Sequence, residues 1–261
     1  MLAAVPHGAL GLALALAVGL VLGLLGGGGS ILALPIFLYV FEVPPKPAVA
    51  MSLAVVGMSA AVGFLGHWRQ GTVNFRVAVP FGALAMVGAF VTARLAHAVP
   101  ARVQLAMFTA FAMTAAVLML RDSLRTPSDA VPVDRTPAHF SGWLAAQALG
   151  VGVLTALIGA GGGFVIVPAL VLLARLPVRV AVGSSLLIIT MNATSGFLGY
   201  IGEVPIAWPL VGAFTGVAAV GAMAGARLVR FVSQRHIKQA FAAMILVFGS
   251  FFVARGLGLL G

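Results

Sequence analysis

Long runs of apolar residues, separated by short polar stretches, make up most of this sequence. Several runs reach the roughly 18 residues that indicate a helix crossing a lipid bilayer. Two of them contain consecutive glycines, in "GLLGGGGSILALP" from Gly23 to Pro35 and "LIGAGGGFVIVP" from Leu157 to Pro168. The pattern predicts an all-α polytopic membrane protein in which two apolar segments are interrupted by glycine.

The composition supports the same class of protein. Hydrophobic residues make up 62% of the chain and charged residues 8%, against about 25% charged residues in a typical soluble domain. The net charge of +10 would suggest nucleic acid in a soluble protein, but these charges lie between apolar runs, where they act as topology signals. We expect a multi-pass protein of the cell (inner) membrane that contacts the lipid bilayer and no nucleic acid. The apolar N-terminus lacks the basic start of a signal peptide, so we interpret it as the first span.

The sequence repeats itself without a gap when it is shifted by 133 residues. Chance similarity between apolar segments would not readily match prolines and basic residues in one register. The matched positions include Gly26 with Gly159, Gly29 with Gly162, Pro35 with Pro168, Pro44 with Pro177, Lys46 with Arg179, and Arg102 with Arg235. The pattern predicts two membrane repeats, residues 1–120 and 141–261, joined by a polar linker over 121–140 that is rich in Pro, Ser, Asp and Arg.

Each repeat is expected to hold one broken segment, 8–41 or 141–174, followed by three plainer spans. As one helix, residues 8–41 would extend roughly 50 Å, against a hydrocarbon core of about 30 Å. A break at the glycines, followed by a short helix ending at a proline, fits better. The plainer spans are expected near 46–66, 77–97 and 103–120, and near 179–200, 206–228 and 236–256.

The relative orientation of the repeats depends on the broken segment. If it crosses the membrane once, the repeats are parallel; if it returns to its starting side, they are inverted. The inverted arrangement divides the basic residues more unequally between the two sides and obeys the positive-inside rule better. We favour inverted repeats, with the linker in the cytoplasm and both termini outside.

The glycine runs predict a binding site near the membrane midplane. Irregular backbone at this depth is tolerated where it is buried in protein or lines a cavity, although glycine also serves close helix packing. A helix is expected to begin near Ser30 and another near Phe164, and the free N–H groups and positive dipole at such ends attract anions. The candidate substrate-binding glycines are Gly27, Gly28, Gly29, Gly161, Gly162 and Gly163.

Hydroxyl and amide side chains beside the glycines complete the candidate site. They are Ser30, Ser52, Ser185 and Asn192, where Asn192 is the repeat equivalent of Ser59. Hydroxyls in membrane helices also bond to their own backbone or join helices, so that alternative stays open for each serine. No carboxylate lies within the predicted spans, which disfavours a cation site, although backbone carbonyls could still hold Na⁺.

Enzyme chemistry is not indicated. The chain has no Cys, which excludes thiolate metal sites and thiol nucleophiles. The glycine runs lack the Lys-Ser or Lys-Thr of an NTPase phosphate loop. The histidines lie near span ends or loops without metal-ligand spacing, and of these His67 could relay protons. We expect no catalytic residues, no metal and no cofactor.

The motifs resemble those of the TauE/SafE-type sulfite exporter family, also called the toluene sulfonate uptake permease family. "GLLGGGGSILALP", "PPKPAVAMSL", "IGAGGGFVIVP" and "PVRVAVGSSL" carry the resemblance, which covers nearly the whole chain except the linker. It implies transport of a sulfur-containing anion such as sulfite, a sulfonate, sulfoacetate or thiosulfate. Together with the glycine segments, it leads us to expect a secondary transporter that works by alternating access. A channel-like small-anion pore is the alternative.

Overall fold

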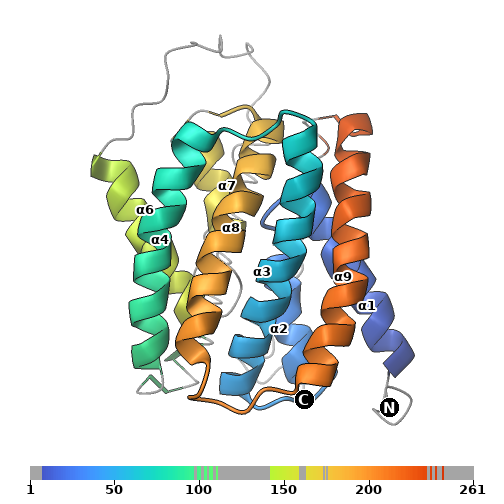
Figure 1. The fold of residues 1–261 in the computed structure, drawn as a ribbon, viewed down its shortest axis with the longest axis vertical. Helices are drawn as coiled ribbons and strands as arrows, with labels where there is room; N and C mark the ends of the chain where they lie inside the picture. Colours follow the sequence, from blue (N-terminus) through green and yellow to red (C-terminus); the bar gives the residue numbers. More distant parts are fainter. Residues whose placement is uncertain are drawn as a thin grey trace.

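The computed structural model describes residues 8–96, 142–158, 163–172 and 176–233, with isolated positions 99, 100, 103, 104, 106, 107, 110, 174, 236, 239 and 243. Its regular elements are helices (Figure 1): α1 (Gly8–Leu25), α2 (Ser30–Tyr39), α3 (Pro45–Arg69), α4 (Phe75–Leu95), α6 (Gly142–Ile158), α7 (Gly163–Leu172), α8 (Val178–Tyr200) and α9 (Trp208–Leu228), which ends in the 3₁₀ turn η3 (Val229–Phe231). The linker 121–140 lies outside the described residues, as do the expected spans 103–120 and 236–256 apart from isolated positions.

Four of these helices are long and apolar enough to cross a membrane: α3, α4, α8, and α9 extended to Phe231. They correspond to the spans expected near 46–66, 77–97, 179–200 and 206–228. Large apolar side chains on α4 and α9 face outward, and Val87 and Val220 are 57% and 66% exposed. An exposed apolar surface of this kind suits contact with lipid, so the chain is a multi-pass membrane protein.

The prediction that each short helix ends at its proline was wrong. Pro35 lies inside α2 and Pro168 inside α7, and both helices continue to Tyr39 and Leu172. Proline removes one backbone donor but holds φ near the helical value. The residues around Pro35 are buried from Ser30 to Phe37, and this packing keeps the chain helical past the missing hydrogen bond.

The segment formed by α1 and α2 folds back on itself. The start of α2 lies against α1, because a Cβ on Gly29 would lie 2.5 Å from the backbone nitrogen of Leu22 and 2.7 Å from its Cβ. At the other end, Gly11 near the start of α1 contacts the ring of Phe41, just after α2. The chain after α2 therefore returns to the first turns of α1.

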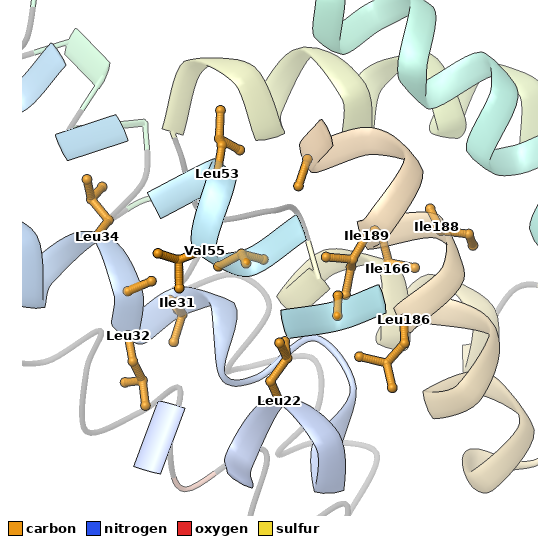
Figure 2. Packing of buried hydrophobic residues seen from close by; sticks show 14 of the residues in the cluster. Leu22, Ile31, Leu32, Leu34, Leu53, Val55, Ile166, Leu186, Ile188 and Ile189 are labelled. Carbon is orange, nitrogen blue, oxygen red and sulfur yellow. The ribbon is translucent and has the colours of Figure 1, made fainter. Parts of the chain in front are cut away.

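The long helices α3 and α8 pack against each other in opposite directions. Close approaches join Gly57 to Thr194, Gly63 to Leu186, and Gly196 to Leu53, so residue numbers rise along α3 as they fall along α8. Buried apolar side chains from α1, α2, α3, α7 and α8 gather into one cluster around this pair (Figure 2). This antiparallel pair forms the centre of the molecule.

Two further helix pairs pack through glycine, and each joins helices far apart in the sequence. Gly19 of α1 meets the backbone of Ala218 in α9, and Gly152 of α6 meets the backbone of Ala85 in α4. The second contact repeats the first with every residue number changed by 133. The absence of a Cβ allows backbones to approach closely, which favours helix association in membranes.

The helix ends that carry most of the described arginines lie together. Gln70 after α3 donates to Ala226 O at the end of α9 (2.8 Å), and Arg179 in the first turn of α8 donates to Val232 O (2.9 Å). The N–H of Asn74, before α4, donates to Ser184 of α8. This end of the molecule carries Arg69, Arg76, Arg179, Arg227 and Arg230. The two described carboxylates, Glu42 and Glu203, lie in loops at the opposite end.

The close contact between α1 and α9 yields a stability test. Gly221→Ala places a Cβ 2.8 Å from the backbone nitrogen of Leu20, so we expect it to lower the free energy of unfolding by about 1–3 kcal/mol. Gly216→Ala on the same helix faces open space and serves as the control, changing stability by less than about 1 kcal/mol. Thermal unfolding in detergent measures both, and equal effects would contradict the packing described.

Candidate functional site

The two glycine segments meet in the interior of the protein. Gly27, between α1 and α2, lies against the backbone of Gly163 at the start of α7, and no side chain would fit at either position. Gly26 has a φ of 73°, a backbone conformation that glycine adopts without steric cost. A Cβ there would lie 2.5 Å from Ser185 Oγ and 3.2 Å from Val182 Cα. The first segment is thus enclosed by α7 and α8.

The backbone N–H groups of this segment have no acceptor among the described residues. Gly26, Gly27, Gly28 and Gly29 are all buried, and none of their N–H groups has a hydrogen bond to a described residue. We expected the unpaired N–H groups to belong to the first turn of α2, and that was wrong. Ser30, Ile31 and Leu32 donate to Gly27 O, Gly28 O and Gly29 O at 3.2–3.3 Å, because a tight turn precedes the helix. The N–H groups without an acceptor in the described part of the chain are instead those of the glycines before α2.

The serines expected at the site bond to their own backbone. Ser30 Oγ donates to Gly27 O (2.6 Å), Ser52 Oγ to Val49 O (2.9 Å), and Ser185 Oγ to Val182 O (2.8 Å). The structure brings Ser30 and Ser185 to the first glycine segment, Ser30 by sequence and Ser185 through its approach to Gly26.

Asn192 lies on α8 and is fully buried. Its Nδ2 donates to Thr155 Oγ1 of α6 at 2.6 Å, while its Oδ1 has no partner in the described part of the chain. Ser59 at the equivalent position of α3 is also fully buried, and its hydroxyl is likewise unpaired there. Two buried polar atoms without a partner, at matched positions, are uncommon in a folded protein. Both flank the centre of the α3–α8 pair.

Two hydrogen bonds tie the long central helices to the ends of α1 and α6. His67 Nε2 lies 3.0 Å from Gly23 O, and Tyr200 OH donates to Ala156 O at 2.8 Å. The residues in the second bond follow those in the first by 133. Each bond satisfies a carbonyl in the last turn of a helix just before a glycine segment, where carbonyls lack intrahelical partners.

Charged groups are scarce around the glycine segments. The only described carboxylates are Glu42 and Glu203, both outside the helices, and Glu203 pairs with Arg94 at 3.4 Å. No cluster of three potential metal-ligating residues occurs within the described ranges. With buried N–H groups and no nearby carboxylate, this arrangement can stabilise a small anion through backbone donors.

Two of the predicted site residues, Gly161 and Gly162, lie outside the described residues. Thr155, the partner of Asn192, was missed by the sequence analysis. It was one of the few polar residues in the apolar run before the second glycine segment, and that isolation was the available signal. The partnership of His67 with Gly23 O could not be read from the sequence, because 44 residues separate them.

Comparison with known proteins assigns the family. The sequence profile described as "Sulfite exporter TauE/SafE" matches residues 11–252, nearly the whole chain. This chain belongs to the TauE/SafE sulfite exporter family. Membership of the TauE/SafE family makes the chain a membrane transporter, in keeping with its apolar helices.

Relatives of this TauE/SafE protein carry matching descriptions. A "Probable membrane transporter protein" of Xylella fastidiosa (strain 9a5c) is 32% identical over 232 residues, covering 88% of each chain. The Bacillus subtilis (strain 168) "Probable membrane transporter protein YdhB" is 27% identical, over 85% of this chain and 90% of the relative. "Probable membrane transporter protein MJ0441" of Methanocaldococcus jannaschii is 25% identical, over 92% and 94%. No solved structure matches the chain.

The contact between the glycine segments can be tested by one methyl group. Gly27→Ala would force the backbones of Gly27 and Gly163 apart, so we expect it to lower the free energy of unfolding by about 2 kcal/mol or more. Gly150→Ala on α6, where a Cβ meets open space, is the matched control and should leave stability nearly unchanged. Thermal unfolding of both purified variants measures the difference. A Gly27 variant as stable as its control would refute the close contact.

Proposed function

We propose that this protein is a secondary transporter of a small sulfur-containing anion, such as sulfite, a sulfonate, sulfoacetate or thiosulfate. The observation that carries the proposal is the run of four buried glycine N–H groups, Gly26 to Gly29, without an acceptor in the described part of the chain. A buried, unpaired donor costs about 1–3 kcal/mol, and an anion that accepts from several donors removes that cost. The family, described as a sulfite exporter family, supports the sulfur chemistry.

An anion fits this site better than a cation. The glycine carbonyls at Gly27, Gly28 and Gly29 already accept from Ser30, Ile31 and Leu32, so their capacity to coordinate Na⁺ is partly used. The N–H groups beside them have no acceptor in the described part of the chain, and the positive end of the α2 dipole lies at the same point. Gly163 lies against Gly27, and in this proposal Gly161 and Gly162, its neighbours in the sequence, contribute to the second half of the site.

Inverted repeats support an alternating-access mechanism. The antiparallel course of α3 and α8, together with the glycine contacts and the α1 and α6 bonds that recur 133 residues later, supports two inverted repeats over 1–120 and 141–261. In this proposal the closely packed α1–α9 and α4–α6 pairs move as bodies against the central pair. Their movement exposes the anion to each side in turn.

The distribution of arginines supports one orientation in the membrane. The end that carries Arg69, Arg76 and Arg179 would face the cytoplasm of a cell (inner) membrane under the positive-inside rule. The linker 121–140 would then lie on that side, and both termini on the other. Arginines at the cytoplasmic end would also raise the local concentration of anions there.

A ligand panel tests the substrate. Purified protein is heated with sulfite, thiosulfate, sulfoacetate or an aryl sulfonate, and with sulfate, chloride, phosphate and small cations at matched ionic strength. A ligand at about 100 times its dissociation constant adds roughly 2.7 kcal/mol of apparent stability. We expect a shift with one class of sulfur anion only. A shift with cations alone would overturn the proposal, and flux in liposomes that does not saturate would favour the channel-like pore.

Two substitutions that differ from each other only in charge then test where the anion binds. Ser185→Asp puts a carboxylate beside Gly26, while Ser185→Asn introduces a neutral group of the same shape. We expect the Asp variant to bind the anion at least tenfold more weakly than the Asn variant, because like charges repel strongly in a buried site. The anion-induced stabilisation of each variant reports its affinity. The unliganded unfolding temperatures of both variants control for folding. Equally weakened anion binding in both variants would show that the anion does not bind beside Gly26.

A further inference from the structure

We propose that His67 is a proton-binding site coupled to the anion at the glycine segments, so that anion and proton bind together. This inference rests on the proposed function and names its coupling ion. His67 is 0% exposed and is the one fully buried histidine among the described residues. It lies near the end of α3, and its Nε2 is 3.0 Å from Gly23 O.

The hydrogen bonds around His67 accommodate two protonation states. A backbone carbonyl only accepts, so Nε2 must carry a hydrogen toward Gly23 O in both states. Thr72 Oγ1 lies 3.0 Å from His67 Nδ1 and 3.1 Å from His67 O. When the imidazole is neutral, the Thr72 hydroxyl donates to Nδ1. When a proton binds the Nδ1 lone pair, Nδ1–H donates to Thr72 Oγ1, and the hydroxyl turns to donate to His67 O.

The proton therefore enters without leaving a buried polar atom unpaired and without moving a heavy atom. Only the hydrogen of the Thr72 hydroxyl rotates. Thr72 is half-buried, so it also connects the fully buried imidazole to the surface loop between α3 and α4. His67 therefore keeps both hydrogen-bond partners, Gly23 O and Thr72 Oγ1, in either protonation state.

The second repeat contains the same bond without the titratable group. Tyr200, 133 residues after His67, donates to Ala156 O at 2.8 Å. A phenol serves the structural purpose of holding a helix-terminal carbonyl, and it does so without binding a proton in the physiological range. A histidine at position 67 holds the equivalent carbonyl and can also bind a proton in that range.

The described charges around His67 include no carboxylate partner for the imidazolium. The elements at this end of the molecule carry Arg69 on α3, Arg76 on α4, Arg179 on α8, Arg227 on α9 and Arg230 on η3. Arg179 donates to Arg230 O and Val232 O, and the other four are exposed. In this proposal the bound anion supplies countercharge to the imidazolium.

The position of His67 near the glycine segment couples its proton to the bound anion. Gly23 lies three residues before Gly26. A proton on His67 therefore lies near the end of α1, just before the glycines whose N–H groups have no acceptor among the described residues. A charge roughly 10 Å from the anion, at an effective dielectric constant of about 20, changes anion affinity by about tenfold. By linkage, the anion raises proton affinity by the same factor.

The experiment counts protons taken up per anion bound. Thiosulfate and benzenesulfonate are the probes, because both keep a constant charge between about pH 5.5 and pH 8, the range in which histidine titrates. A pH indicator in weakly buffered detergent solution reports proton uptake, and binding is measured on the same samples. We expect wild-type affinity to rise about tenfold toward low pH, with anion-linked proton uptake.

Variants separate a proton site from a structural one. His67→Gln retains a donor for Gly23 O but cannot titrate, so binding should persist and proton uptake should disappear. Thr72→Val removes the partner of Nδ1 and should move the uptake to lower pH, which keeps the test open if the Gln variant fails to fold. Tyr200→Phe, which deletes the equivalent bond, and His236→Gln, at an exposed histidine, should leave the uptake unchanged.

The outcomes distinguish the two proposals. Anion binding without proton uptake in the wild type, or uptake that survives His67→Gln, overturns the coupling and leaves the anion site intact. Loss of uptake in Tyr200→Phe as well as in His67→Gln also overturns it, since the effect would then be structural. If neither probe binds and the wider panel gives no sulfur-anion shift, the proposed function itself fails.

Discussion

The need to satisfy backbone polar groups inside an apolar interior governs this structure. An N–H or C=O group in an apolar interior has no water to bond with, yet the glycines from Gly26 to Gly29 are buried there, with Gly27 against Gly163. The protein meets part of the need internally, through the tight turn at Ser30 and the bonds from His67 and Tyr200 to helix-terminal carbonyls. A concentrated set of N–H donors has no acceptor in the described part of the chain, and it lies where Gly27 meets Gly163.

The same constraint explains why several hydroxyl groups bond to their own helices. Ser52, Ser185 and Thr190 bond to carbonyls of their own helices, which satisfies them without cost to packing. Asn192 and Ser59 differ, because each keeps an unpaired buried oxygen in the described part of the chain. These oxygens lie near the centre of the central helix pair, where a moving or liganded state could satisfy them.

The sequence predicted which segments are helical better than it predicted which residues bond to one another. The spans around α3, α4, α8 and α9 could be placed because apolar runs must match the thickness of a bilayer. The continuation of α2 past Pro35 was not predictable, since it depends on how tightly its neighbours bury that turn. The glycines were identified as important from their position alone, but the N–H groups that stay free depend on the turn before Ser30. The bonds of His67 and Asn192 join distant segments, and no local pattern encodes them.

The pairing of α1 with α9 has a consequence for how the chain is made. The glycine face of α1 at Gly19 and Gly23 fits the backbone of α9, about 200 residues later in the sequence. At roughly 5–20 residues per second, α1 waits on the order of ten to forty seconds after synthesis before its partner emerges. During that interval the first helix is held in the membrane by lipid or by the insertion machinery. The α1–α9 pair therefore forms only after most of the described chain has been synthesised.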